Sequence, residues 1–233
     1  RAYLRKAGLD KRHLGSVAVT QRRHAEAHPR ALMRKPLTMK EYLAARPIVE
    51  PLKLYDCCLE TDGAVAILVT TAERARDLKK PPVLIAGAVW GGGHTLFSNQ
   101  QELAETAAWR SAPRLFAMAD LTPADVDVAE IYDPFSFAVP MQLEAYGFCD
   151  KNEGGDFVLS GATALGGKLP VNTHGGFLSE GYVHGLNHAC EAVSQLRGEA
   201  GPRQVQGAKI ALSTGAPGYV GGATSALLLR GAA

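Results

Sequence analysis

Cysteines are few in this sequence, and none has the spacing of a metal site. The four cysteines are Cys57, Cys58, Cys149 and Cys190, and no two of them form a C-x-x-C pair. This pattern argues against both a zinc site and a disulfide framework. We therefore expect no bound metal, and we expect a reducing compartment, the cytoplasm.

An excess of one charge and a long apolar run are also lacking. The 25 Lys and Arg residues against 23 Asp and Glu residues leave a net charge of +2, which does not favour nucleic acid as a partner. No apolar run is long enough to cross a bilayer and no signal-peptide pattern is present, so we expect no membrane partner. Because the chain begins at Arg1 rather than at methionine, we expect a fragment or a processed protein.

Apolar residues are plentiful, and they recur with the spacing of alternating strands and helices. The 233 residues are 46% hydrophobic, enough for the core of one large domain or two small ones. Apolar runs predict buried strands at 64–70, from 83 onwards, at 126–131, and as a pair within 209–231. Helical spacing is found at 71–78, 99–118, 136–146 and 186–197, and a glycine-rich loop spans 147–172. This alternation predicts an α/β fold, with a break at 79–82.

The first 55 residues are basic and read as irregular. Several cations lie close together in this stretch: Arg22, Arg23, Arg30, Arg34 and Lys35. Two interpretations remain open, a solvated surface loop, which most charge runs form, and a loop that contacts phosphate groups.

Glycines, histidines and a tyrosine crowd the stretch VNTHGGFLSEGYVHGLNHACEAV, just before a predicted helix. Glycine turns of this kind let a backbone approach a ligand closely. His174, His184 and His188 lie within fifteen residues, but loops like these do not offer the spacing of zinc ligands. We expect His174 to be structural and His188 to pack in the first turn of the helix. His184 either shares the pocket of Tyr182 or bonds to backbone.

Four segments follow, in order, a pattern known from one superfamily. They are YDCCLETDGAVAILVTTAERARDL, LTPADVDVAEIYDPFSFAVPMQLEAYGFC, LPVNTHGGFLSEGYVHG and STGAPGYVGGATSALLL. The chain resembles the C-terminal half of the thiolase superfamily, in its lipid-transfer-protein or sterol-carrier-like branch. The resemblance implies an α/β, thiolase-like fold with a mixed sheet covered by helices. Residues 1–80 would be a loop region with the last strand and helix of the N-terminal thiolase half, and residues 81–233 the C-terminal half.

The departures from the family pattern concern its catalytic positions. Tyr132 stands where the family has an oxyanion-binding Asn or His, and Pro134 replaces a cysteine found in one variant of that loop. Tyr182 replaces the catalytic histidine, and Gly215 replaces the acid/base cysteine if the GGA triplet sets the register. Claisen chemistry needs a thiol nucleophile and a base, and the matched loops supply neither. Two half-buried tyrosines could simply pack, but their places on two converging loops favour catalysis.

The resemblance also implies binding roles for several neighbours of the tyrosines. His184, Asp133, Gly218 and Tyr219 are the predicted substrate-binding residues. For Asp133 the plainer interpretation is a turn residue that bonds to its own backbone, although its carboxylate could also orient a neighbouring group. Pro217 lacks an N–H, so one backbone donor of the glycine loop is absent.

The basic segment before the letters KPLT resembles the loop that holds coenzyme A in this family. Arg23, Arg34 and Lys35 are its predicted coenzyme A contacts.

A thiolase pocket that gains two phenols and lacks the thiol is suited to C–C cleavage without an acyl-enzyme. The chain resembles the thiolase-like aldolases of steroid side-chain degradation. This implies retro-aldol cleavage of a β-hydroxyacyl-CoA, a 17-hydroxy steroid with a C20 carboxyl-CoA giving a 17-keto steroid and propionyl-CoA. The alternatives are a sterol-carrier-type thiolase or acyltransferase that uses a cysteine elsewhere, and a non-catalytic acyl-CoA- or lipid-binding homologue.

The resemblance further implies the cofactors and partners of such an enzyme. No prosthetic group is expected, since coenzyme A is part of the substrate. A homodimer of thiolase-like subunits is implied, and with it an OB-fold partner subunit of an acyl-CoA hydratase.

Overall fold

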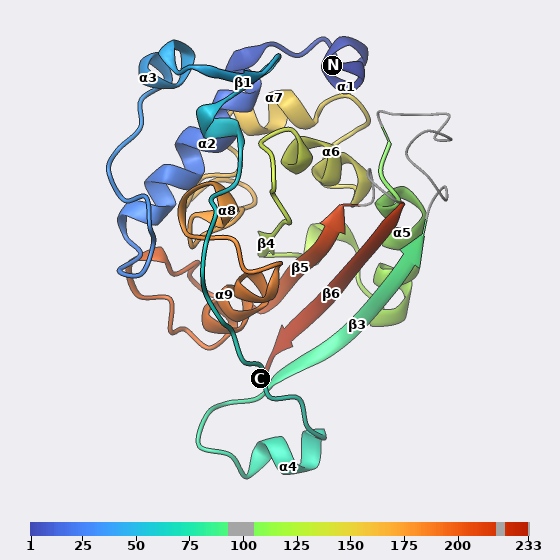
Figure 1. The fold of residues 1–233 in the computed structure, drawn as a ribbon. Helices are drawn as coiled ribbons and strands as arrows, with labels where there is room; N and C mark the ends of the chain where they lie inside the picture. The colour runs from blue at the N-terminus through green and yellow to red at the C-terminus, as the bar shows by residue number, and fades with distance from the viewer. Residues whose placement is uncertain (93–104, 218–221, 233) are drawn as a thin grey trace.

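The computed structural model describes residues 1–92, 105–217 and 222–232 (Figure 1). At its centre is a four-stranded sheet in the order β3, β6, β5, β4. The strands are β3 (Val83–Gly92), β4 (Val128–Glu130), β5 (Ile210–Pro217) and β6 (Ala223–Gly231). β6 is antiparallel to both of its neighbours, whereas β4 runs parallel to β5, so the sheet is mixed, as the sequence predicts.

Two helices cover opposite faces of this sheet. α5 (Ala108–Ala119) packs against β3 and β6, and α9 (Leu186–Leu196) packs against β4 and β5. Side chains of a strand alternate between faces, so Leu228 of β6 joins the cluster that contains Leu115 of α5. The next residue, Leu229, joins the cluster that contains Ala192 of α9. Alternation along one strand thus builds two separate cores.

The N-terminal region is more helical than the sequence predicts. It contains α1 (Ala2–Lys6), α2 (Lys11–Glu26) and α3 (Met39–Ala44), then β1 (Pro47–Val49), β2 (Leu52–Lys53) and the 3₁₀ turn η1 (Leu54–Asp56). The expectation of an irregular stretch over residues 1–55 is therefore wrong. Asp10 caps α2 by accepting from Arg12 N at 2.8 Å, and Leu14, Val17 and Ala18 are buried at helical spacing.

Short elements between the long ones carry the loops of interest. They are α4 (Ala72–Arg76), η3 (Pro123–Asp125), α6 (Ala138–Ala145), α7 (Gly154–Leu159), α8 (Gly176–Ser179) and η4 (Gly201–Arg203). The predicted helices at 71–78, 136–146 and 186–197 are confirmed in shorter form as α4, α6 and α9. α7 lies inside the stretch that the sequence predicts to be a glycine-rich loop. Part of the predicted helix at 99–118 lies outside the described residues.

Two predicted buried strands are not buried in this chain. Residues 64–70 have no strand structure, and Ile67, Leu68 and Val69 are exposed by 43%, 81% and 70%. β3 is a strand, but Leu84, Ile85 and Trp90 on it are exposed as well. The physical reason is that α5 packs on one face of β3, whereas α9, on the other face of the sheet, packs against β4, β5 and β6, so among the described residues the second face of β3 has no helix over it. The division into residues 1–80 and 81–233 stays a prediction.

Candidate active site

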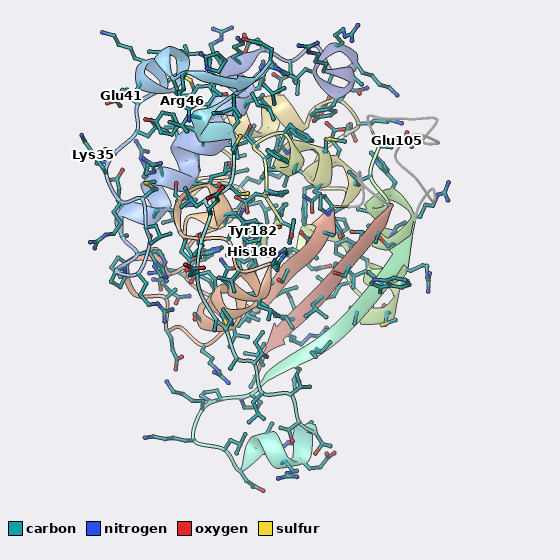
Figure 2. The ribbon with its side chains drawn as sticks, viewed as in Figure 1. Lys35, Glu41, Arg46, Glu105, Tyr182 and His188 are labelled. Carbon is teal, nitrogen blue, oxygen red and sulfur yellow. The ribbon has the colours of Figure 1, made fainter. Side chains whose placement is uncertain are left out.

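The two tyrosines singled out from the sequence meet in the structure. Tyr132 lies two residues after β4, and Tyr182 follows α8. Their hydroxyl oxygens are 2.7 Å apart, and their rings meet edge to face with centroids 6.1 Å apart. Figure 2 shows Tyr182 near the middle of the molecule. The convergence that the motif order predicts is therefore present, and one phenol donates a hydrogen bond to the other.

His184 is the third polar group at this point. Its Nδ1 lies 3.3 Å from the hydroxyl of Tyr182 and 3.5 Å from that of Tyr132. His184 has a left-handed backbone with φ of +47°, an uncommon conformation for a residue with a side chain. Gly185 follows with φ of +89°, and a Cβ there would lie 3.2 Å from the Tyr132 ring. The glycine thus permits a close approach to Tyr132. His184 is exposed and Tyr182 half-buried, so the group is open on one side.

The backbone of Tyr132 is held by polar side chains from two other elements. Its N–H donates to Thr214 Oγ1 at 2.8 Å, and its carbonyl accepts from Gln142 Nε2 at 2.7 Å. Thr214 in turn donates to Gln142 Oε1 at 2.8 Å. Thr214 belongs to β5, in the segment of the family pattern that also contains Gly215. A Cβ at Gly215 would lie 2.1 Å from Ser225 Oγ, so a cysteine there would require the Ser225 hydroxyl to turn away.

Asp133 points inward from the loop that carries Tyr132. It is fully buried, and its two oxygens accept from Phe177 N at 3.1 and 3.0 Å. Oδ1 also accepts from His188 Nε2 at 3.0 Å. These partners lie 44 and 55 residues away, so the expected bond to its own backbone is replaced by long-range contacts. The alternative, a carboxylate that orients its neighbours, fits this geometry.

His174 and His188 are buried and in contact with each other. His174 Nε2 lies 3.1 Å from His188 Nδ1. Burial alone would lower the pKa of His174, but the Glu130 carboxylate 2.9 Å from its Nδ1 outweighs this and raises the pKa to about 9. The sequence predicts structural and packing roles for these two histidines, but it gives no sign that they meet.

The basic residues divide into one buried and several exposed cations. Arg22 is buried and donates to Ser179 Oγ at 3.0 Å and to the Lys35 carbonyl at 3.1 Å. Arg23, Arg34 and Lys35, the predicted coenzyme A contacts, are exposed (Lys35 in Figure 2). Arg22 therefore ties the basic segment to α8, just before Tyr182.

A mostly apolar groove of about 380 Å³ lies beside the basic segment. Its lining includes Leu32, Met33, Ile48 and Cys58. The N–H of Cys58 donates to the Pro134 carbonyl at 3.0 Å, so one wall of the groove is bonded to the loop of Tyr132. The sequence offers no signal for this groove, because its lining comes from segments that only folding brings together.

Gly218 and Tyr219, also predicted from the sequence to bind substrate, lie outside the described residues. Across the residues that the structure does describe, no group of three or more His, Cys, Asp or Glu side chains is arranged to hold a metal ion. Nor is any helix within the described ranges both long and apolar enough to span a bilayer.

The family of the chain follows from comparison with known proteins. Residues 91–230 match the family described as thiolase C-terminal domain-like, and the chain belongs to this family, in the sterol-carrier-like branch of the thiolase superfamily. A monomeric SCP2-thiolase-like protein from Mycobacterium smegmatis superposes with a TM-score of 0.71 at 17% identity, over 98% of this chain and 49% of that one. This similarity supports the fold alone.

Proteins that are more similar to this chain have names that refer to steroids. The chain is 47% identical to a 17-hydroxy-3-oxo-4-pregnene-20-carboxyl-CoA lyase of Mycobacterium tuberculosis, over 85% of this chain and 53% of the relative. It is 39% identical to a steroid side-chain-cleaving aldolase of Thermomonospora curvata, over 98% of this chain and 59% of the relative. A solved structure described as Ltp2-ChsH2(DUF35) aldolase superposes with a TM-score of 0.93 at 39% identity, over 98% of this chain and 60% of that one. The chain thus spans 53–60% of the length of these relatives.

Proposed function

We propose that the protein containing this chain is a carbon–carbon lyase that cleaves a β-hydroxyacyl-CoA by a retro-aldol reaction. The observation that carries the proposal is the pair of tyrosine hydroxyls, 2.7 Å apart, at the positions where the resemblance places the oxyanion-binding group and the catalytic histidine. The names of the two relatives, a carboxyl-CoA lyase and a steroid side-chain-cleaving aldolase, support it. The proposed substrate is a 17-hydroxy steroid with a C20 carboxyl-CoA, and the products are a 17-keto steroid and propionyl-CoA.

The reaction needs one base and one acid. The base takes the proton of the β-hydroxyl group, the Cα–Cβ bond breaks, and its electron pair passes to the α-carbon as a thioester enolate. The acid then protonates that carbon, so no co-reactant is consumed. Tyr182 and Tyr132 share a hydrogen bond, and either can pass its proton to the other. His184 Nδ1 faces both hydroxyls and can accept a proton from them or hold the substrate oxygen.

The remaining parts of the proposal concern binding and assembly. Arg23, Arg34 and Lys35 contact the coenzyme A phosphates, and Gly218 and Tyr219 bind the substrate. The enzyme needs no prosthetic group and works in the cytoplasm. It forms a homodimer and binds an OB-fold subunit of an acyl-CoA hydratase. The name of the solved Ltp2-ChsH2(DUF35) complex supports a partner subunit in general terms.

A product assay tests this function with the full-length protein and its partner subunit. The aldolase releases propionyl-CoA and a ketone from the β-hydroxyacyl-CoA without added coenzyme A. A thiolase instead cleaves a 3-ketoacyl-CoA only when coenzyme A is added, and a carrier binds without turnover. Either of the last two results would contradict the proposal.

Removal of the Tyr182 hydroxyl tests its role directly. Tyr182→Phe keeps the ring and removes the proton donor, so we expect turnover to fall by roughly 10²–10⁴-fold at little cost in stability. Tyr132→Phe should do the same, and the double variant should lose less than the product of the two, because both groups serve one step. Tyr146→Phe, a tyrosine buried in the core, is the control and should retain turnover. Near-native turnover of the Tyr182→Phe variant would mean that Tyr182 serves only in packing.

A further inference from the structure

A row of four buried ionisable side chains lies behind the tyrosine pair. Glu130 Oε2 is 2.9 Å from His174 Nδ1, and His174 Nε2 is 3.1 Å from His188 Nδ1. His188 Nε2 is 3.0 Å from Asp133 Oδ1. All four side chains are at most 2% exposed. We call this row the buried relay.

The contacts fix how many protons the buried relay holds. His188 Nε2 also lies 2.9 Å from the Ile131 carbonyl, which can only accept, so this nitrogen must carry a hydrogen. Each of the three contacts joins two atoms that would repel each other unless one of them carried a proton. Two neutral imidazoles supply two protons and two carboxylates supply none, so a third proton is required. This third proton sits either on a histidine, which is then an imidazolium, or on one of the two carboxylates, which is then a carboxylic acid.

His174 is the histidine that holds the extra proton. Burial opposes its charge, but Glu130 raises its pKa to about 9, and Glu180 and Glu191 act in the same direction. The ion pair with Glu130 is electrostatic rather than an aligned hydrogen bond. His174 Nε2–H then donates to His188 Nδ1, which leaves His188 with its hydrogen on Nε2. Other charged or titratable groups also surround the pair: His24 on α2, and Arg203, which pairs with Glu191 at 2.9 Å.

His188 in this tautomer clamps the backbone on both sides of Tyr132. Its Nε2–H is shared between the carbonyl of Ile131 and the carboxylate of Asp133, the residues directly before and after Tyr132. Asp133 also accepts from Phe177 N. The Phe177 ring lies 4.2 Å from His188, 4.8 Å from Tyr132 and 4.6 Å from Tyr182, measured between centroids. One imidazole thereby fixes the tyrosine loop and, through Phe177, the ring against which both tyrosines pack.

We propose that His174 is a positioning residue for the tyrosine pair: its imidazolium, held by Glu130, locks His188 in the Nε2–H tautomer that clamps the loop of Tyr132. The catalytic consequence rests on the proposed function, whereas the tautomer does not. Distances between reacting groups strongly affect rate, so a loop freed by a wrong tautomer should lower turnover more than substrate binding.

Nitrogen-15 NMR of the full-length protein, labelled at histidine, tests the protonation states without any substrate. Near pH 7 we expect His188 to carry hydrogen on Nε2 only, and His174 to carry hydrogen on both nitrogens. Individual assignments come from His174→Gln and His188→Gln spectra. A neutral His174 near pH 7, or a native His188 with hydrogen on both nitrogens, would overturn the proposal whatever reaction the enzyme performs.

Two substitutions at His174 then separate its donor function from simple filling of space. His174→Gln keeps an N–H that can donate to His188, whereas His174→Met fills similar space without one. We expect His174→Met to allow the other His188 tautomer and to lower kcat by roughly 10–100-fold with KM little changed, and His174→Gln to restore most of the loss. His28→Gln changes a buried histidine outside the relay and should leave kcat unchanged.

Equal kcat values for His174→Met and His174→Gln would contradict the donor function. So would an unchanged His188 tautomer in His174→Met. If His174→Met does not fold, the NMR spectrum of the native protein decides.

Discussion

At the scale of single residues, the buried histidines predict how stability depends on pH. The pKa of His174 is raised to about 9 in the folded chain, above its ordinary value near 6.5. The protonated form of His174 therefore stabilises the folded chain. This contribution is fully present below pH 6.5 and is lost as pH rises through 9. Burial lowers the pKa of His24 and His28 to about 4, so their contribution is lost as pH falls from 6.5 towards 4. Stability should therefore be greatest near pH 6.5.

Urea unfolding across this pH range checks the expectation. His174→Met should flatten the alkaline slope, which is worth at most a few kcal/mol, and leave the acid slope in place. His28→Gln is the matched change and should flatten only part of the acid slope. An alkaline slope that persists in His174→Met would show that another group causes it.

The tyrosine pair could be predicted from the sequence, but the buried relay could not. Tyr132 and Tyr182 occupy positions that a known pattern already places on converging loops. Asp133 and His188 are 55 residues apart, and nothing local distinguishes either from an ordinary turn residue or a packed helix residue. Long-range pairs of this kind become visible only when the fold brings β4 and α9 together.

At the scale of elements, α2 shows why the local sequence signals of a basic stretch fail to predict its helix. Its sequence, KRHLGSVAVTQRRHAE, contains several cations and a mid-helix glycine, which lowers helix propensity. Yet a Cβ at Gly15 would lie 2.6 Å from the Tyr42 ring, so the glycine lets α3 pack closely. Arg22 is also turned inward rather than into solvent. Tertiary packing here outweighs the local signals.

The exposed cations of this N-terminal region lead to a prediction about the binding of coenzyme A. If Arg23, Arg34 or Lys35 contacts its phosphates, reversal of one charge, as in Arg34→Glu, should weaken acyl-CoA binding by on the order of 1–2 kcal/mol. The effect should shrink as salt rises, because screening weakens exposed contacts. Calorimetric titration of the full-length protein at low and high salt measures both.

Arg76→Glu is a matched control for this experiment. Arg76 lies at the end of α4, an element that Figure 1 shows far from α2 and α3. Its charge reversal should leave binding unchanged. Unchanged dissociation constants at low salt for charge reversals at Arg23, Arg34 and Lys35 would mean that the basic segment is a plain solvated surface.

At the scale of the whole molecule, the sequence predicts more burial than this chain provides. The sheet order and the two helical layers agree with the predicted α/β class. The run at 64–70 has the composition of a strand buried on both faces, but its side chains are exposed here. An apolar, β-branched run fits burial rather than solvent. The relatives are longer than this chain, so we expect the missing cover to come from the part of the protein outside it.

Charged substitutions in residues 64–70 test whether the rest of the protein covers this run. They are made both in the isolated chain and in the full-length protein. In the isolated chain, Leu68→Lys with Val69→Lys should change the free energy of unfolding by no more than about 0.5 kcal/mol per site, because both side chains are exposed, and should reduce self-association. In the full-length protein the same pair should cost several kcal/mol, since two lysines would be buried without partners. Leu159→Lys, at the exposed end of α7, is the control and should be mild in both. Urea unfolding gives the energies and light scattering the association. Equal, small effects of Leu68→Lys with Val69→Lys in the two proteins would mean that residues 64–70 remain a surface segment in the complete fold.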